Sequence, residues 1–122
     1  MPVSGVRGAT VAMANTAHAI WDASEELMAE LIRLNAISPD EVVAAFFTMT
    51  PDLNAAYPAY AARRLGWTRV PLLGAVETAV PGMPERMIRI LIEVERPKRQ
   101  VLTPAYLHGT LSLRPDLAPP ED

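Results

Sequence analysis

The chain has 122 residues, of which 50% are hydrophobic, and a formal net charge of −3. This predicts a single domain, residues 1–122, with one core. The absence of cysteine excludes disulfides and thiolate chemistry, and the negative charge argues against a general nucleic-acid binder. No apolar run approaches the ~20 residues of a membrane span. Residues 1–7 lack a secretory pattern, so we expect a cytoplasmic protein without membrane association.

Arginine dominates the basic residues, because Lys98 is the only lysine among eleven. Residues 1–60 hold two basic and seven acidic residues, net −5, whereas residues 61–122 hold nine basic and seven acidic residues, net +2. The planar fork of arginine grips carboxylate or phosphate through two hydrogen bonds, so fixed arginines would suit a small anionic ligand. Arginine usage also varies between proteomes, and composition does not separate the two explanations.

A strand and a long helix are predicted first. Residues 3–13 predict a strand in which Gly5 and Gly8 flank Arg7, and glycine there permits close approach of a ligand or a neighbour. Asn15 or Thr16 can cap the next element. Apolar residues then recur at spacings of three and four, which predicts a core helix with an acidic outer face: Ala17, Ile20, Trp21, Ser24, Leu27, Met28, Leu31 and Ile32.

Residues 38–49 predict a short helical turn and then a strand. Ser38-Pro39-Asp40-Glu41 has the pattern of a capping box with proline at the first helical position. Val42–Met49 is apolar, has the length of a strand and lacks alternation. Such a run predicts an interior strand that is covered on both faces.

Residues 50–67, TPDLNAAYPAYAARRLGW, predict a short helix with a binding role. Asp52 or Asn54 can cap its start, Pro58 suits its first turn, and Gly66 can end it in the left-handed conformation. Its alanines are good helix formers but too small to anchor a core. We therefore expect its large side chains to face a partner, a ligand or solvent: Tyr57, Tyr60, Arg63 and Arg64.

The second half predicts three further strands: Thr68–Leu73, Met87–Glu95 and Tyr106–Leu113. Glu77 lies among apolar residues and would need a partner if buried. Arg89 lies on the strand face opposite the β-branched residues, where a surface ion pair with Glu93 is the alternative to a functional role. Residues 97–104, with Arg96 before them, predict an exposed basic loop, and residues 115–122 predict a flexible tail.

Several catalytic chemistries lack their motifs. The chain holds no P-loop, no dinucleotide-binding glycine pattern, no close carboxylate pair and no nucleophile elbow. Its two histidines, His18 and His108, are far apart in the sequence, which favours structural or surface roles over a metal site. Arginines, one semi-buried glutamate and tyrosine hydroxyls remain. This set can bind and orient an acidic molecule and stabilise charge, and it calls for no metal and no cofactor.

These residues together resemble a known family. The matching features are RGAT at Arg7–Thr10, residues 50–67, the isolated Glu77, IRI around Arg89, and Tyr106 followed by LRPDL at Leu113–Leu117. In this order and spacing they resemble the small monofunctional chorismate mutases of the trimeric α/β class, over essentially the whole chain. The family rearranges chorismate to prephenate within one molecule, in aromatic amino-acid biosynthesis, so no nucleophile is required.

The resemblance implies a fold, an assembly and a site. It implies an α/β (α+β) fold with a mixed β-sheet packed with helices, assembled as a homotrimeric pseudo-α/β-barrel with active sites between subunits. It implies that Arg89 donates to the ether oxygen, that Glu77 accepts from the ring hydroxyl, and that Arg7 and Tyr106 hold the side-chain carboxylate. It implies further substrate-binding residues, some from the neighbouring subunit: Tyr57, Arg63, Leu73, Gly74, Leu113 and Arg114.

The chain departs from the family pattern at a few of these positions. Tyr57 replaces a familiar phenylalanine, Tyr60 replaces a frequent lysine, and Leu73 and Gly74 replace threonine and cysteine. Two alternatives stay open. One is a non-catalytic trimeric module that binds a small dicarboxylate, and the other is an imine- or enamine-hydrolysing protein of similar architecture.

Overall fold

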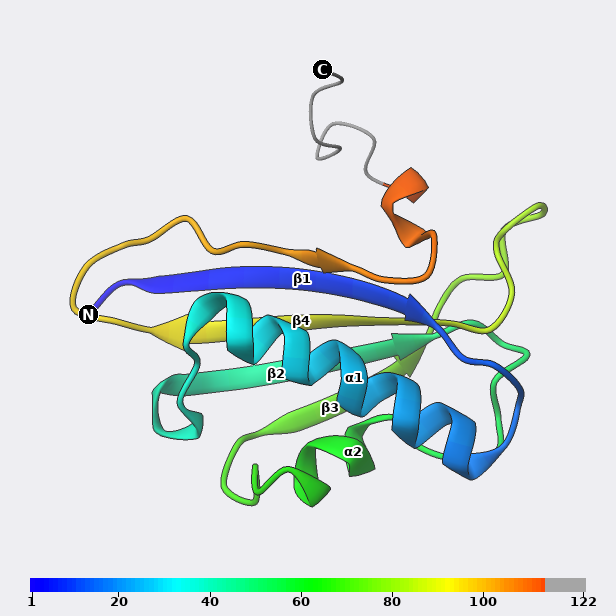
Figure 1. Ribbon diagram of the computed structural model, residues 1–122, viewed down its shortest axis with the longest axis horizontal. Coiled ribbons are helices and arrows are strands. Elements are labelled where there is room, and N and C mark those ends of the chain that lie inside the picture. Colours follow the sequence, from blue (N-terminus) through cyan, green and yellow to red (C-terminus); the bar gives the residue numbers. More distant parts are fainter. Residues whose placement is uncertain (114–122) are drawn as a thin grey trace.

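A five-stranded mixed sheet forms the centre of the structure, a computed structural model that describes residues 1–113 (Figure 1). The strand order is β3-β2-β4-β1-β5. β4 is antiparallel to both β1 and β2, whereas β5 is parallel to β1 and β3 is parallel to β2. The strands are β1 Val3–Val11, β2 Val42–Met49, β3 Leu72–Val76, β4 Met87–Glu95 and β5 Ala105–Tyr106. The mixed α/β fold is thus confirmed.

Two α-helices accompany the sheet, α1 at Ala17–Asn35 and α2 at Ala59–Arg64. α1 lies across one face of the sheet, and α2 lies beside α1, near β3 (Figure 1). The predicted cap of α1 is Thr16, whose hydroxyl accepts a hydrogen bond from the Ala19 N–H at 3.1 Å. The apolar stripe of α1 is buried as predicted: Ile20, Leu27, Met28 and Leu31. No helix within residues 1–113 is long and apolar enough to cross a membrane.

Within residues 1–113, helices cover only one face of the sheet. The covered face packs its apolar side chains against α1, and a Cβ added at Gly8 would meet Leu27 and Leu31 of that helix. β2 is an interior strand, as predicted, because it pairs with β3 and β4. The prediction that both of its faces are covered is wrong for this chain, since Phe46 is 36% exposed on the open face. An open apolar face calls for a partner or a ligand.

The segment between β2 and α2 differs from its prediction. α2 begins at Ala59, after Pro58, so neither Asp52 nor Asn54 caps it. Asp52 instead accepts a hydrogen bond from the Arg86 N–H at 2.8 Å. The Asn54 side-chain oxygen accepts a hydrogen bond from the Asn15 side-chain amide at 2.8 Å. Both residues lie too far ahead of the helix to cap it, because the chain runs seven residues beyond Asp52 before α2 begins. Gly66 ends the helix with φ +92°, as predicted.

Two predicted strands are wrong in their extent. The first was predicted at residues 68–73, but β3 starts at Leu72, since Pro71 has no N–H to donate to a ladder. The second was predicted at residues 106–113, but β5 ends at Tyr106 and a 3₁₀ turn, η2, covers Thr110–Leu113. His108 and Gly109 take φ +53° and +83° between them, which reverses the chain and breaks the alternation. Residues 115–122 lie outside the described part of the chain.

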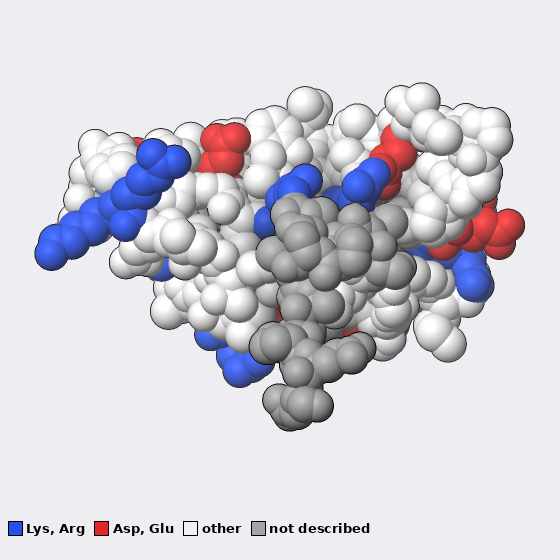
Figure 2. Space-filling model, turned by 90° about the horizontal axis from the view of Figure 1, so that it is seen from above, with Lys and Arg blue, Asp and Glu red and all other residues white. Residues whose placement is uncertain are grey.

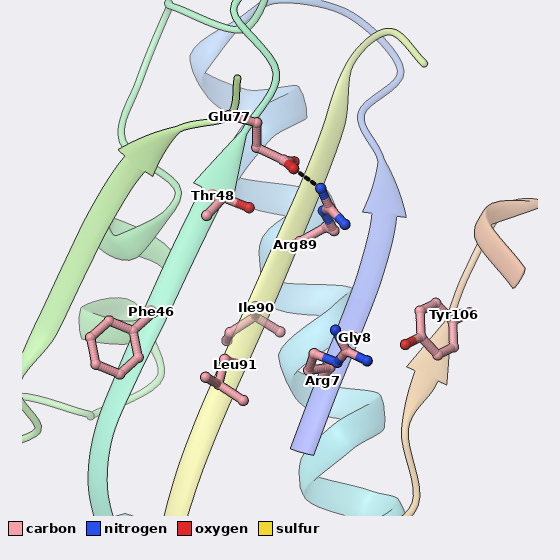
Figure 3. A pocket seen from close by; sticks show the side chains of 9 residues that line it. All are labelled: Arg7, Gly8, Phe46, Thr48, Glu77, Arg89, Ile90, Leu91 and Tyr106. Carbon is pink, nitrogen blue, oxygen red and sulfur yellow. Dashed lines mark hydrogen bonds and ion pairs between the residues drawn. The ribbon is translucent and has the colours of Figure 1, made fainter. Parts of the chain in front are cut away.

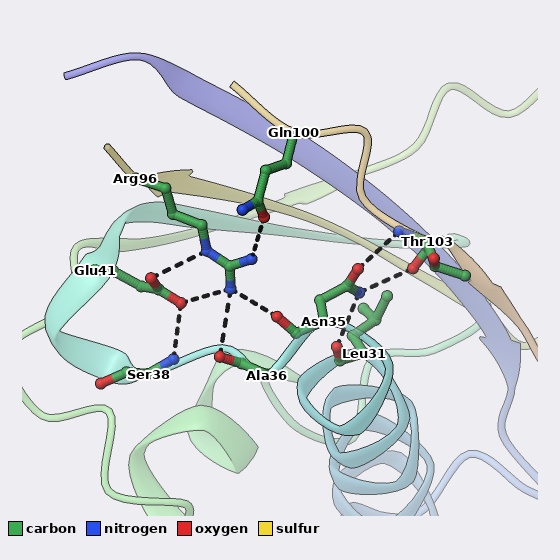
Figure 4. A network of polar contacts seen from close by, with 8 residues as sticks. All are labelled: Leu31, Asn35, Ala36, Ser38, Glu41, Arg96, Gln100 and Thr103. Atoms are coloured by element: carbon green, nitrogen blue, oxygen red, sulfur yellow. Dashed lines mark hydrogen bonds and ion pairs between the residues drawn. The ribbon is translucent and has the colours of Figure 1, made fainter. Parts of the chain in front are cut away.

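Arg96 joins the end of β4 to the C-terminus of α1 (Figure 4). Its guanidinium donates to the Glu41 carboxylate at 3.0 and 2.7 Å, to the Asn35 carbonyl at 2.7 Å and to the Gln100 side chain at 2.7 Å. Glu41 lies at the end of a 3₁₀ turn, η1, at Pro39–Glu41, and also accepts from the Ser38 N–H. The prediction of an exposed basic residue is wrong for Arg96, whose side chain is only 13% exposed, because helix carbonyls and a carboxylate converge on it.

Glu41 makes the stability of this network sensitive to acid. The hydrogen bond from Arg96 holds the pKa of Glu41 below its usual value, against the opposing effect of burial. A lowered folded-state pKa stabilises the protein above the unfolded pKa, and this contribution is lost as the pH falls through the folded pKa. We expect Glu41→Gln to be less stable than the wild type at pH 7, and the difference to shrink below about pH 4.5. Urea denaturation at each pH measures it, and a constant difference would contradict it.

Candidate active site

The open face of the sheet carries a pocket of about 300 Å³ (Figure 3). Its walls come from β1, β2, β4 and β5 and from the residue that follows β3. The lining residues are Arg7, Gly8, Phe46, Thr48, Glu77, Arg89, Ile90, Leu91 and Tyr106. Four of them, Arg7, Glu77, Arg89 and Tyr106, were predicted as site residues from the sequence.

Arg89 and Glu77 form an ion pair at one end of this pocket (Figure 3). The sheet register brings them together, because Arg89 pairs with Thr48 of β2 and the last residue of β3, Val76, pairs with Met49. The side chain of Glu77 is 9% exposed and that of Arg89 is 49% exposed. The predicted partner of the semi-buried glutamate is therefore an arginine, and the alternative pair of Arg89 with Glu93 is wrong.

The ion pair leaves hydrogen-bonding capacity on both sides. The Glu77 Oε1 atom is engaged by Arg89, whereas its Oε2 atom is buried and has no hydrogen-bond partner among the described residues. A buried carboxylate oxygen without a donor is costly. One guanidinium nitrogen of Arg89 binds Glu77, and the half-exposed remainder faces the pocket. The pair can therefore accept one hydrogen bond from a ligand and donate others to it.

Arg7 and Tyr106 line the pocket further along the sheet (Figure 3). Arg7 pairs with Leu91 of β4, and Tyr106 pairs with Ala9 of β1. The charged groups of the lining are thus two guanidinium groups and one carboxylate. In the view from above, basic side chains lie near the middle of the molecule, with an acidic one close to them (Figure 2). Such a surplus of fixed cations suits an anionic ligand.

The other predicted site residues lie elsewhere in a single chain. Tyr57 is 79% exposed, and Arg63 lies on the exposed side of α2. Leu73 and Gly74 lie on the edge strand β3 and are exposed. None of these four lines the pocket described above. Leu113 ends η2, but its side chain and the whole of Arg114 lie outside the described part of the structure.

Sequence reasoning missed the apolar wall of the pocket. Phe46 of β2 and Leu91 of β4 pair on the open face, and the next pair on that face is Thr48 and Arg89 (Figure 3). The alternation of β4 could have placed Leu91 beside Arg89, because residues two apart share a strand face. β2 offered no such signal, since its apolar run does not show which of its faces is open.

The donor set points to hydrogen bonding and charge rather than to metal binding. Within residues 1–113 no three His, Cys, Asp or Glu side chains cluster as metal ligands would. His108 lies at the surface with its Nε2 atom 2.6 Å from Glu26 Oε1. His18 packs edge-on against Trp21, with ring centroids 6.0 Å apart. The predicted surface or structural roles of the two histidines are confirmed.

Comparison with known proteins identifies the family. The model of the family described as chorismate mutase type I matches residues 3–117. The chain belongs to this family. The chorismate mutase AroH of Thermus thermophilus is 43% identical over 118 residues, which cover 94% of this chain and 96% of the relative. The chorismate mutase AroH of Bacillus subtilis is 36% identical over 121 residues, 97% of this chain and 94% of the relative.

A solved structure supports the same assignment. The chorismate mutase of Clostridium thermocellum superposes with a TM-score of 0.85 at 36% sequence identity, covering 89% of this chain and 98% of that one. The resemblance to the trimeric α/β chorismate mutases, drawn from RGAT, residues 50–67, Glu77 and Arg89, is therefore confirmed at the level of family and fold.

Gly8 of the RGAT motif allows strand β5 to approach β1. A Cβ at this position would lie 2.9 Å from a Leu27 methyl carbon and 3.0 Å from the Ala105 carbonyl oxygen, whereas one at Gly5 would meet Leu91 at 3.4 Å. We expect Gly8→Ala to lower the free energy of unfolding by about 1–3 kcal/mol through overpacking. Gly5→Ala, on the same strand, is the control and should have little effect. Urea denaturation compares them, and equal stabilities would contradict the prediction.

Proposed function

We propose that this chorismate mutase rearranges chorismate to prephenate on the open face of its sheet, with Arg89 and Glu77 at the reacting centre. The family makes it an isomerase of aromatic amino-acid biosynthesis. The rearrangement breaks a C–O bond and forms a C–C bond within one molecule, so it needs no nucleophile and no cofactor. The observation that carries the assignment is the Arg89–Glu77 pair, with one carboxylate oxygen buried and unsatisfied beside the pocket.

Arg89 is the proposed electrostatic catalyst. The ether oxygen of chorismate gains negative charge as the C–O bond breaks, and a fixed donor directed at it is worth more in the transition state than in the ground state. Glu77 holds one nitrogen of the guanidinium, which limits its motion. The remaining N–H groups of Arg89 are free to point into the pocket. Donors that are already oriented require no reorganisation during the reaction.

Glu77 is the proposed acceptor for the ring hydroxyl of chorismate. Its Oε2 atom is buried without a partner among the described residues, and Glu77 itself lines the pocket. A hydroxyl donor would satisfy this atom and fix the orientation of the ring. A module that only binds dicarboxylates would use the arginines equally well, but it would have no need of this acceptor.

Arg7 and Tyr106 are the proposed binding groups for the side-chain carboxylate. Both lie on the pocket lining at a distance along the sheet from the Arg89–Glu77 pair (Figure 3). Contacts at both ends of the substrate would select its compact reactive conformer, which removes much of the entropic cost of the rearrangement.

We further propose that the active protein is a homotrimer with each site shared between two subunits. Apolar side chains are exposed on the open face of β2 and of the edge strand β3, including the paired residues Phe46 at 36% and Leu73 at 62%. A partner on this face would cover them and close the pocket. Tyr57 and Arg63 would then reach the site from the adjacent subunit, with Leu73, Gly74, Leu113 and Arg114 completing it. Cytoplasmic location stays a prediction.

Arg89 variants test the reaction and its proposed centre. Mixing the purified wild type with chorismate should accelerate the loss of chorismate absorbance, and no acceleration over buffer would overturn the function. Arg89→Ala should lower kcat by at least ~10²-fold, as expected for the loss of one preorganised donor. Arg89→Lys should also fail, since an ammonium does not reproduce the fork. Arg33→Ala is the control, because Arg33 is exposed on α1 and pairs with Glu30. Hydrolysis of imines without loss of chorismate would favour the hydrolase alternative.

Mixed oligomers test the shared site. Light scattering at micromolar concentration should give the mass of three chains. Arg63→Ala and Arg89→Ala should each be inactive alone, but trimers reassembled from a mixture should regain activity. In a random mixture about a quarter of the interfaces would combine the intact Arg63 of one subunit with the intact Arg89 of the next. A monomeric wild type, or a mixture as inactive as its components, would contradict the shared-site proposal.

A further inference from the structure

The short segment Met49–Asp52 holds both chain segments that carry the Arg89–Glu77 pair. The Glu77 N–H donates to the Met49 carbonyl at 2.9 Å. Thr50 bonds to the first residue of β4 in both directions: its N–H donates to the Met87 carbonyl at 3.0 Å, and its hydroxyl accepts from the Met87 N–H at 3.0 Å. Thr50 is buried, with 1% of its surface exposed. The end of β2 is therefore an anchor for both partners of the ion pair.

Asp52 holds the residue before β4 in an unusual conformation. Arg86 has φ +52°, a left-handed value that arginine rarely adopts. The Arg86 N–H donates to the Asp52 carboxylate at 2.8 Å. On the other side, the Arg86 carbonyl accepts from the Ala12 N–H at 2.8 Å, and its guanidinium donates to the Met13 carbonyl at 3.1 Å. The left-handed turn is thus held from the ends of both β1 and β2.

The carboxylate of Asp52 is adapted to this contact. Burial alone would raise its pKa, but hydrogen bonds from the Thr50 side chain and from the backbone N–H of Arg86 outweigh burial, and the pKa of Asp52 is lowered. Asp52 is therefore ionised at neutral pH. A charged acceptor makes a stronger hydrogen bond to a backbone N–H than a neutral one does.

Arg89 lies close to the end of β4 that this turn holds in place. The β2–β4 ladder ends at the pair Met49 and Ile88, and the next pair inward is Thr48 and Arg89. The last pairs of a ladder open first when their flanking turn loosens. A change in the direction of the chain at Arg86 would therefore reach Arg89 before any other residue of the pocket on β4.

We propose that Asp52 is a positioning residue for the rearrangement: its carboxylate keeps Arg86 left-handed at the start of β4 and thereby sets the guanidinium of Arg89 against Glu77. The inference rests on the proposed function, because it concerns the placement of the proposed catalytic donor. Asp52 does not line the pocket, so it acts on the reaction only through β4. A displaced donor would weaken transition-state binding more than substrate binding.

Steady-state kinetics on four variants test the proposal. Asp52→Ala should lower kcat by about tenfold or more, with KM for chorismate changed by less than about twofold, since misplacement of a catalytic group acts chiefly on the chemical step. Asp52→Asn keeps an oxygen acceptor and should retain most of the wild-type kcat. Adding Arg86→Gly to Asp52→Ala should restore kcat, because glycine adopts a left-handed φ without strain. Glu41→Ala is the stability control, since Glu41 accepts hydrogen bonds at the opposite end of the sheet.

The outcomes separate the inference from the function on which it rests. Wild-type turnover is measured first, and its absence would overturn the proposed function itself. Given turnover, Asp52→Ala with a wild-type kcat, or with a kcat no lower than that of Glu41→Ala at a matched melting temperature, would overturn the positioning role. Failure of Arg86→Gly to restore the kcat of Asp52→Ala would also overturn the positioning role. If Asp52→Ala does not fold, the double variant with Arg86→Gly decides, because it should be both folded and active.

Discussion

The ion pair between Arg89 and Glu77 is the interaction on which the site depends. The two residues come from segments that are not neighbours in the sheet, because β2 lies between β3 and β4. They meet only because both segments are in register with the end of β2. A carboxylate that is 9% exposed needs a cation close by. The pairing therefore ties the sheet order and register to the chemistry, since both strands that carry the pair are aligned by β2.

The open face of the sheet sets a second constraint. α1 covers one face, and the opposite face carries the pocket together with exposed apolar side chains such as Phe46 and Leu73. A face of this kind is costly in water and is typical of an interface. The proposed trimer accounts for it and for the exposure of Tyr57 and Arg63, which the proposed site requires but which do not line the pocket of one chain. Assembly and activity would then depend on the same surface.

The turn before β4 shows how polar residues with strong local preferences can serve tertiary contacts. Asp52 and Asn54 are types that cap helices, yet their side chains bond to residues far away in the sequence: Asp52 accepts from the Arg86 N–H, and Asn54 accepts from the Asn15 side-chain amide. Asn15 and Asn54 bond to each other reciprocally, which joins the loop after β1 to the segment that leads to α2. Hydrogen bonds to buried or half-buried backbone groups are worth most where no water competes for them. The anchored turn accordingly lies beside the proposed site.

The sequence by itself determined the elements whose signals are local. The periodicity of α1, the alternation of Met87–Glu95 and the left-handed stop at Gly66 follow from neighbouring residues, because side-chain period and backbone φ are short-range properties. Residue patterns typical of the family also predicted Arg89 and Glu77. Only the tertiary structure decided that they pair with each other, that Asp52 holds a turn instead of capping a helix, and that one sheet face stays open. These outcomes depend on strand register across residues far apart in the chain, and no local preference encodes that register.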